Sequence, residues 1–267
     1  MFREVPSKWM NEAFEMRSYL FSKMSSWARE ISPNPKDNCV LLKVGFQHSG
    51  GFFNWPDDDR VLCKPAKDAS EGPYCAQPVQ KIWDCVKARL WLDTCARFHG
   101  SLCKEEVPQI PGMNMIDCER LVIVKVTKDM PWLALSYVWG KSFQAEDAAG
   151  YRAGSSISSA IFKTISDAIT VTLQLGYRYL WVDEYCIDQT DEQHRDEQIK
   201  RMDQIYRGAD LTIVAAAGDN KAHGLPGVGS TEREVREVVC VNEMVIFSNG
   251  PSPDDQAERS KWYTRAW

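Results

Sequence analysis

Three short segments bring together aromatic, glycine and acidic side chains, and each of them closely follows an apolar run. They are 136–140 (Ser-Tyr-Val-Trp-Gly), 183–189 (Asp-Glu-Tyr-Cys-Ile-Asp-Gln) and 217–220 (Ala-Gly-Asp-Asn) with its continuation at 223–227. An aromatic ring beside glycine offers a stacking surface for a flat ligand ring, and clustered carboxylates suit hydroxyl recognition or acid–base chemistry. The alternative interpretation is that Tyr137 and Trp139 pack a loop while the acidic side chains solvate it.

A second group of residues has the spacing of metal ligands. Cys95, His99 and Cys103 stand at i, i+4 and i+8, so a helix would present all three on one face to a zinc ion. A fourth ligand is missing nearby, although Cys85 and Cys118 are available, and the tight Cys-x-x-Cys turn is absent. We therefore favour a cluster at a helix end that packs against the core, and we predict no metal site.

Other patterns are weaker indications of chemistry. Cys186 and His194 have the residue types of a thiol nucleophile and its base, but eight residues of separation guarantee no contact. The acidic residues between Asp183 and Glu197 lack the spacing of a calcium loop. The glycines at 224–229 lack the lysine of a phosphate-binding loop and the order of a dinucleotide fingerprint, so they indicate a turn.

Alternating apolar strands and amphipathic helices must position these segments. Strands are predicted at 121–126, 133–137, 179–182 and 211–216. Apolar residues at i, i+3 and i+4 predict a helix over 157–173 with Gly176 at its C-cap, and Thr190 to Gln193 fits a capping box that opens a helix reaching Ala209. Strands that are apolar on both sides predict a three-layer α/β fold whose mostly parallel sheet is flanked by helices on both faces. A late hairpin (238–240 with 244–247) and a final helix capped by Ser260 complete this part.

The first half of the chain is less regular. Residues 1–78 are predicted to be an irregular, loop-rich N-terminal extension, with an amphipathic helix over Met10 to Met24 and short strands such as 40–44. Residues 79–117 are predicted to be a helical lead-in that carries Ile82, Val86, Leu90 and Trp91 at helical spacing. The third part, 118–267, is the α/β domain.

Composition excludes several classes of protein. The 267 residues are 44% hydrophobic and 26% charged, which is typical of a folded globular chain. The net charge of −5 argues against a nucleic-acid-binding surface spread over the molecule. The sequence has neither an apolar stretch of about 20 residues nor a signal-peptide core, so we expect no membrane association, a cytoplasmic location and nine reduced cysteines.

Taken together, the segments resemble the fungal heterokaryon-incompatibility (HET) domain. The matching pieces are 133–140 (Leu-Ala-Leu-Ser-Tyr-Val-Trp-Gly), 176–189 (Gly-Tyr-Arg-Tyr-Leu-Trp-Val-Asp-Glu-Tyr-Cys-Ile-Asp-Gln), 202–206, 209–215 and 224–227. The resemblance covers roughly residues 90–267, in the family's order and spacing. It implies a role in fungal non-self recognition, where incompatible hyphal fusion triggers programmed cell death. The domain is similar to Toll/interleukin-1 receptor (TIR) domains, so a flavodoxin-like fold is implied as well.

Several TIR relatives cleave NAD at the nicotinamide–ribose bond, so the resemblance implies NAD as a substrate and no required cofactor. Projected onto this chain, it places the nucleotide beside the segment ending at Gly140 and beside a mobile loop over 183–189. The binding residues so implied are Ser136, Tyr137, Trp139, Gly140, Asp183, Cys186, Asp188 and Gln189.

The family's catalytic glutamate is expected after the run from Trp262 to Trp267, which continues in the family into a segment ending in Gln-Glu. This sequence stops at Trp267, and Glu184 is the one weak substitute that we can name. The alternative function is a non-catalytic signalling module that assembles with itself, and the partners implied are other incompatibility proteins or further copies of the chain.

Overall fold

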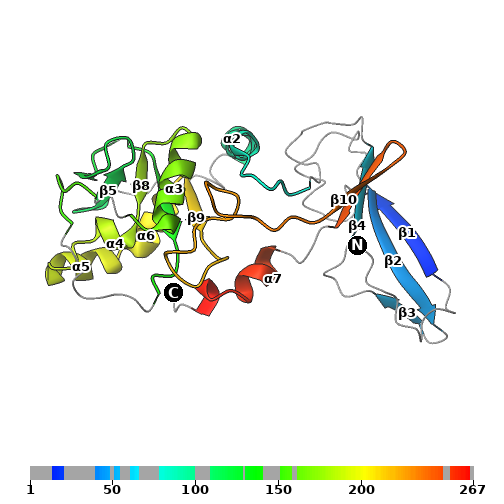
Figure 1. The fold of residues 1–267 in the computed structure, drawn as a ribbon. Coiled ribbons are helices and arrows are strands. Elements are labelled where there is room, and N and C mark those ends of the chain that lie inside the picture. The colour runs from blue at the N-terminus through cyan, green and yellow to red at the C-terminus, as the bar shows by residue number, and fades with distance from the viewer. Residues whose placement is uncertain are drawn as a thin grey trace. The chain divides into compact units, whose positions relative to one another are not determined.

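The computed structural model describes residues 14–20, 40–48, 51–54, 61–65, 78–99, 109–128, 130–140, 151–157, 161–248 and 253–264. The chain divides into two compact units. The first consists of residues 1–80 together with 234–256, and the second of residues 81–233 together with 257–267. Figure 1 shows the elements of both units and labels most of them.

The first unit is built on an antiparallel sheet. Its strands run in the order β1-β2-β4-β11-β10, and β3 pairs with the last four residues of β2, from Gly45 to His48. The strands are β1 (Phe14–Leu20), β2 (Val40–His48), β3 (Gly51–Asn54), β4 (Val61–Pro65), β10 (Val238–Val241) and β11 (Met244–Ser248). The predicted late hairpin is confirmed as β10 and β11, and β11 pairs with β4 from the beginning of the chain.

Two predictions for the first 78 residues need correction. The helix expected over Met10 to Met24 is wrong, because residues 14–20 form β1, which pairs residue by residue with β2. The run from Phe14 to Arg17 also alternates apolar and polar residues with a period of two, and the partner strand decides between the two patterns. The strand predicted at 40–44 is confirmed and continues to His48. The N-terminal extension was predicted to be irregular and loop-rich, but it contributes four strands, β1 to β4, to the sheet.

The second unit contains a mixed five-stranded sheet in the order β6-β5-β8-β7-β9. Its strands are β5 (Asn114–Asp117), β6 (Val122–Lys125), β7 (Trp132–Ser136), β8 (Tyr179–Trp181) and β9 (Leu211–Val214). β7 runs parallel to β8 and β9, whereas β5 runs antiparallel to β6 and β8. The prediction of a mostly parallel sheet is therefore wrong for half of the pairings, because β5 was not foreseen as a strand.

Helices flank this sheet. They are α2 (Cys85–Thr94), α3 (Lys163–Gln174), α4 (Asp183–Cys186), α5 (Glu192–Ile199) and α6 (Met202–Gly208), and the second unit also has a π-helical turn at Cys95–His99 and a 3-10 turn at Trp262–Thr264. A further helix, α7 (Pro253–Glu258), begins in the part of the chain that belongs to the first unit. α3 packs on β7 and β8. Its C-cap residue is Leu175, one position before the predicted Gly176, and Gly176 follows with the positive φ, +86°, that is typical of the glycine after a helix. α6 sets Tyr206 edge-on against Trp181 of β8.

Four details of the helices differ from expectation. The N-cap of α5 is Asp191, whose carboxylate accepts a hydrogen bond from the His194 N–H at 3.0 Å, and not Thr190. The helix expected to run on to Ala209 breaks between α5 and α6. Ser260 caps the short 3-10 turn, because its hydroxyl accepts from the Tyr263 N–H, whereas α7 precedes it. The apolar residues of the lead-in helix are largely exposed on α2 and just before it.

The core of the second unit lies along the sheet. Fully buried side chains come from β5, β7 and β8: Ile116, Leu133, Leu135, Leu180 and Trp181. Arg178 ties the start of β8 to β5 through a 2.5 Å contact with Asp117. Burial works to raise the pKa of Asp117, but hydrogen bonds from Arg178 and from two backbone N–H groups outweigh it and hold the pKa below its ordinary value of 3.8. In the part of the chain that the structure describes, no helix has the length and apolar character to cross a membrane.

Candidate functional site

The three polar segments singled out in the sequence follow the carboxyl ends of β7, β8 and β9. Because these strands are parallel, with Ala134 opposite both Trp181 and Thr212, their carboxyl ends lie at one edge of the sheet. We call this edge, with the segments 136–140, 183–189 and 217–221, the strand-end site. Such edges are where ligands bind in open α/β sheets.

Gly140 shows how closely two of the segments approach each other. Its φ is +94°, and a Cβ atom built on it would lie 2.6 Å from the Cβ of Asn220. A larger residue at this position would therefore be strained and would also push the third segment away. The glycine next to Trp139 is thus explained by the close packing of the loop after β7 against the loop after β9.

The centre of the strand-end site is a buried group of three polar side chains. Tyr137 donates a hydrogen bond to one carboxylate oxygen of Glu184 at 2.6 Å, and the Lys221 ammonium contacts the other oxygen at 2.6 Å. The side chains of Lys221 and Glu184 are only 2% and 6% exposed, so this ion pair is almost completely removed from water. The three residues, which we call the buried triad, join the ends of all three strands.

The surroundings of the buried triad keep Tyr137 protonated. Burial, followed by the nearby charges of Asp183 and Glu184, raises the pKa of Tyr137 well above its ordinary value of 10. Tyr137 therefore remains a donor at neutral pH. Lys221 also lies over the ring of Phe162, with its nitrogen 3.9 Å from the ring centroid. Since both oxygens of Glu184 are engaged, its carboxylate serves the structure rather than acting as an accessible acid or base.

Asp183 and Trp139 form the layer next to the buried triad. Both oxygens of Asp183 lie 3.0 Å from the indole nitrogen of Trp139, and one of them also accepts from the Glu184 N–H at 2.8 Å. Asp183 is buried and Trp139 is half-buried. The Gln189 side chain donates to the carbonyl oxygens of Asp183 and Ile187, which closes the segment on itself. The segment 183–189 begins as helix α4, so its first part is not the loop that was expected.

Ser136, at the end of β7, has a partner that the sequence did not suggest. Its hydroxyl accepts a 2.8 Å hydrogen bond from the indole N–H of Trp262, in the 3-10 turn close to the end of the chain. Ser136 is buried at 3% exposure. The family-like run that begins at Trp262 is thereby joined to the strand-end site.

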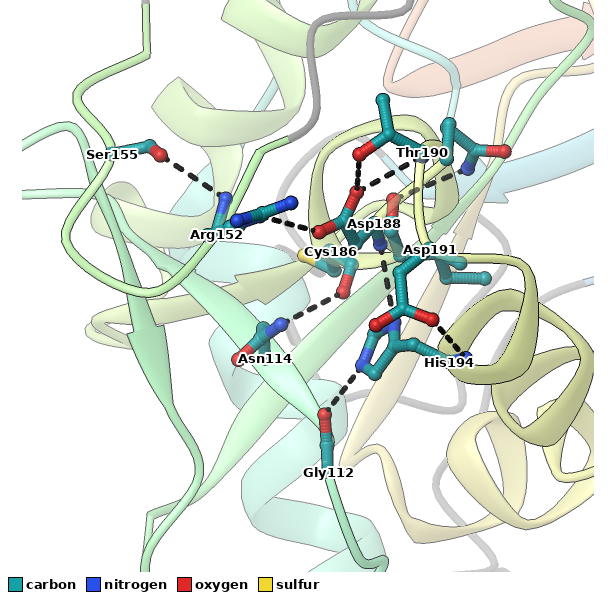
Figure 2. A network of polar contacts seen from close by, with 11 residues as sticks. Gly112, Asn114, Arg152, Ser155, Cys186, Asp188, Thr190, Asp191 and His194 are labelled. Carbon is teal, nitrogen blue, oxygen red and sulfur yellow. Dashed lines mark hydrogen bonds and ion pairs between the residues drawn. The ribbon is translucent and has the colours of Figure 1, made fainter.

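Asp188 belongs to a second network, drawn in Figure 2. Its carboxylate accepts from the Thr190 hydroxyl at 2.6 Å and from the Arg152 guanidinium at 2.9 Å. Burial works to raise the pKa of Asp188, yet the hydrogen bonds from Thr190 and the charge of Arg152 hold it below its ordinary value. In the same picture, the Asp188 N–H donates to Nδ1 of His194, whose Nε2 lies 2.9 Å from the Gly112 carbonyl oxygen. This network fixes the turn that leads into α5.

Cys186 lies inside the fold and does not pair with His194. Its thiol contacts the Val182 N–H and the Leu180 carbonyl oxygen, and both nitrogens of the imidazole are engaged elsewhere. Burial raises the pKa of Cys186 to about 12, so the thiolate that a nucleophile needs is suppressed. The thiol-and-base interpretation is wrong, and the assignment of Cys186 as a ligand-binding residue is not supported by its position.

The other sequence-based candidates have simple outcomes. Within the ranges that the structure describes, no cluster of three or more His, Cys, Asp or Glu side chains could hold a metal ion. Cys103, the third of the spaced ligands, lies outside those ranges. Sequence reasoning missed Lys221 and Trp262 as parts of the site. The available signal for Lys221 was its place directly after the third polar segment.

The chain was compared with known families and proteins. A family profile described as "Heterokaryon incompatibility protein (HET)" matches residues 132–267. The Vegetative incompatibility protein HET-E-1 of Podospora anserina is 22% identical over 161 residues, which cover 58% of this chain and 10% of that protein. This chain therefore spans a small part of the length of that relative. No solved structure matches. The family profile covers half of the chain, including the strand-end site, and the chain belongs to the heterokaryon incompatibility (HET) family.

Proposed function

We propose that this chain acts in fungal heterokaryon incompatibility, in the non-self recognition that ends in programmed cell death, and that the strand-end site is the part through which it acts. The observation that carries the proposal is that the family-matched motifs, far apart in the sequence, meet at one edge of the sheet around the buried triad. The name of the relative HET-E-1 also refers to vegetative incompatibility, and this chain covers 10% of that protein.

The ligand proposed for this site is a nucleotide such as NAD, as the similarity to TIR domains implies. Trp139 supplies a half-buried aromatic ring at the edge, and Asp183 fixes that ring through its N–H. An aromatic ring held in this way suits stacking against a flat ring such as that of nicotinamide. Glu184 does not fit the part of the catalytic glutamate, because both of its oxygens are bound to Tyr137 and Lys221 inside the fold.

Expression of the chain in a fungal host tests the proposal. We expect induced expression of the wild-type chain to lower the number of viable cells. Asp183→Asn, which weakens the anchor of the Trp139 ring, should restore viability. The matched control is Asp203→Asn, the same chemical change in a solvent-exposed pair with Arg207, and it should leave killing intact. Full viability with the well-expressed wild-type chain would contradict the proposed role.

A second candidate is a non-catalytic module that signals by assembling with itself. The specific observation in its favour is that the one carboxylate considered for catalysis, Glu184, is sealed in an ion pair. The two candidates differ in NAD turnover. Purified chain is incubated with NAD, and nicotinamide release is followed by chromatography. Release above a no-protein control would support the enzyme, whereas killing without release would support the module.

A further inference from the structure

β10 lies at one end of the first unit's sheet, so one of its long sides has no neighbouring strand within the described part of the chain. Its four residues are Val238, Val239, Cys240 and Val241, and all are exposed, with the valines between 44% and 48%. Natural edge strands are often very short, or carry a lysine, a proline or a bulge that prevents pairing with another chain. β10 is short, with four residues, but it has no lysine or proline, and its register with β11 has no bulge.

The hairpin decides which backbone groups face the edge. Val241 and Met244 flank a two-residue turn, Asn242-Glu243, in which the φ of Asn242 is +53° while that of Glu243 is not positive, the φ pattern of a type II′ turn. A two-residue turn of this kind closes on a hydrogen-bonded pair, and hydrogen-bonded pairs alternate along an antiparallel ladder. Val239 and Val241 therefore direct their N–H and C=O groups to β11. Val238 and Cys240 direct theirs to the open edge.

We propose that β10 is a dimerisation strand, and that a second copy of this chain adds its own β10 antiparallel to it. The two sheets then join into one sheet that runs through both copies. A two-fold axis perpendicular to the sheet keeps corresponding side chains on the same face, and it places Val239 opposite Val239 of the second copy. Val238 of each copy then faces Cys240 of the other. Both residues with outward backbone groups are used, and four main-chain hydrogen bonds form.

Other registers with the same two-fold symmetry form fewer main-chain hydrogen bonds between the two β10 strands. An axis centred on Val238 or on Cys240 leaves a single hydrogen-bonded pair within β10, hence two main-chain bonds instead of four. The occupant is a second copy because the edge is complementary to itself. The same two residues supply the donors and the acceptors, and the β-branched valines suit cross-strand packing with identical neighbours. Interfaces of this self-complementary kind are the commonest in homo-oligomers.

This proposal goes beyond the proposed function and names a surface for the self-assembling candidate. It concerns the first unit alone and needs neither a ligand nor the strand-end site. Its failure is therefore distinguishable from a failure of the incompatibility role. Killing by a chain that stays monomeric would overturn the dimer and leave that role in place.

Molar mass in solution gives the first test, measured by size-exclusion chromatography with light scattering over a dilution series of the full chain. The wild-type mass should rise from 30.4 kDa towards twice that value as the concentration increases. Val239→Lys sets two like charges opposite each other at the axis and should weaken dimerisation at least about tenfold. Val235→Lys, at an exposed valine before β10, is the matched control and should dimerise like the wild type. A monomer at every concentration, or equal dimerisation of both lysine variants, would overturn the proposal.

Cysteine cross-linking tests the register. In a non-hydrogen-bonded pair the Cα atoms are about 4.5 Å apart, which is within the range of a disulfide. Val239→Cys in a Cys240→Ser background should therefore give a disulfide-linked dimer after mild copper-catalysed air oxidation. Val241→Cys in the same background should not, and neither should Cys240→Ser alone. Equal cross-linking at 239 and 241, or none at 239, would show that the register is wrong.

Discussion

Replacing Lys221 by methionine removes the only cation of the buried triad and leaves the Glu184 carboxylate without its ion-pair partner inside the fold. The side chains of the pair are 2% and 6% exposed, and the nitrogen–oxygen distance is 2.6 Å. Breaking a pair of this kind costs about 3–5 kcal/mol, because one charge stays buried without compensation. For a unit of this size, that loss corresponds to a fall of roughly 6–20 °C in the melting temperature.

Urea unfolding measured at neutral pH provides the assay, and two further variants make it specific. Glu184→Gln combined with Lys221→Met removes both charges and keeps an acceptor for Tyr137, so it should recover much of the lost stability. Arg207→Met breaks an exposed pair with Asp203 and should cost less than about 1 kcal/mol. A Lys221→Met chain within about 1 kcal/mol of the wild type would refute the reasoning, since the carboxylate would then be reaching water or another cation.

Three further predictions concern single contacts. Trp262→Phe removes the hydrogen bond to Ser136 but keeps an aromatic ring, and urea unfolding should show a loss of about 1 kcal/mol. The paired carboxylate of Asp117, whose pKa is lowered in the folded chain, contributes stability that is complete above its ordinary pKa of 3.8 and lost as the pH falls below that value. Asp117→Asn should therefore flatten the acid limb of a stability–pH curve. In the folded chain at pH 8, an aromatic disulfide reagent should modify exposed Cys240 and leave buried Cys186 intact. Equal labelling of the two would contradict the burial.

The parts of the fold that could be predicted are those in which local pattern and tertiary environment agree. β7, β8 and β9 are apolar on both sides, as strands covered by helices must be, and all three were foreseen. β5 was missed, because its four residues begin and end with polar side chains, Asn114 and Asp117, that are buried through contacts from elsewhere in the chain. The apolar residues of β1 fit both the helical period and the strand period, so the sequence alone predicts a helix there, and only pairing with β2 decides for the strand.

The sequence predicts that the three polar segments meet at one edge of the sheet, which the parallel strands confirm, but it does not predict the contacts among their side chains. Motif position placed Tyr137, Asp183 and Glu184 at one edge, and the parallel strands bring them together. That Glu184 is buried in an ion pair depends on Lys221, 37 residues further along the chain. No local spacing encodes such a contact. The same holds for Ser136 and Trp262, which are 126 residues apart.

The measurement that tests the central claim most directly is calorimetric titration of the purified chain with NAD. If the strand-end site is the functional site, the wild-type chain binds NAD and Asp183→Asn weakens binding at least about tenfold, because the Trp139 ring loses its charged anchor. Asp203→Asn should bind like the wild type. Binding that is equal in all three chains, or absent from the folded wild type, would contradict the assignment of this edge as the nucleotide site.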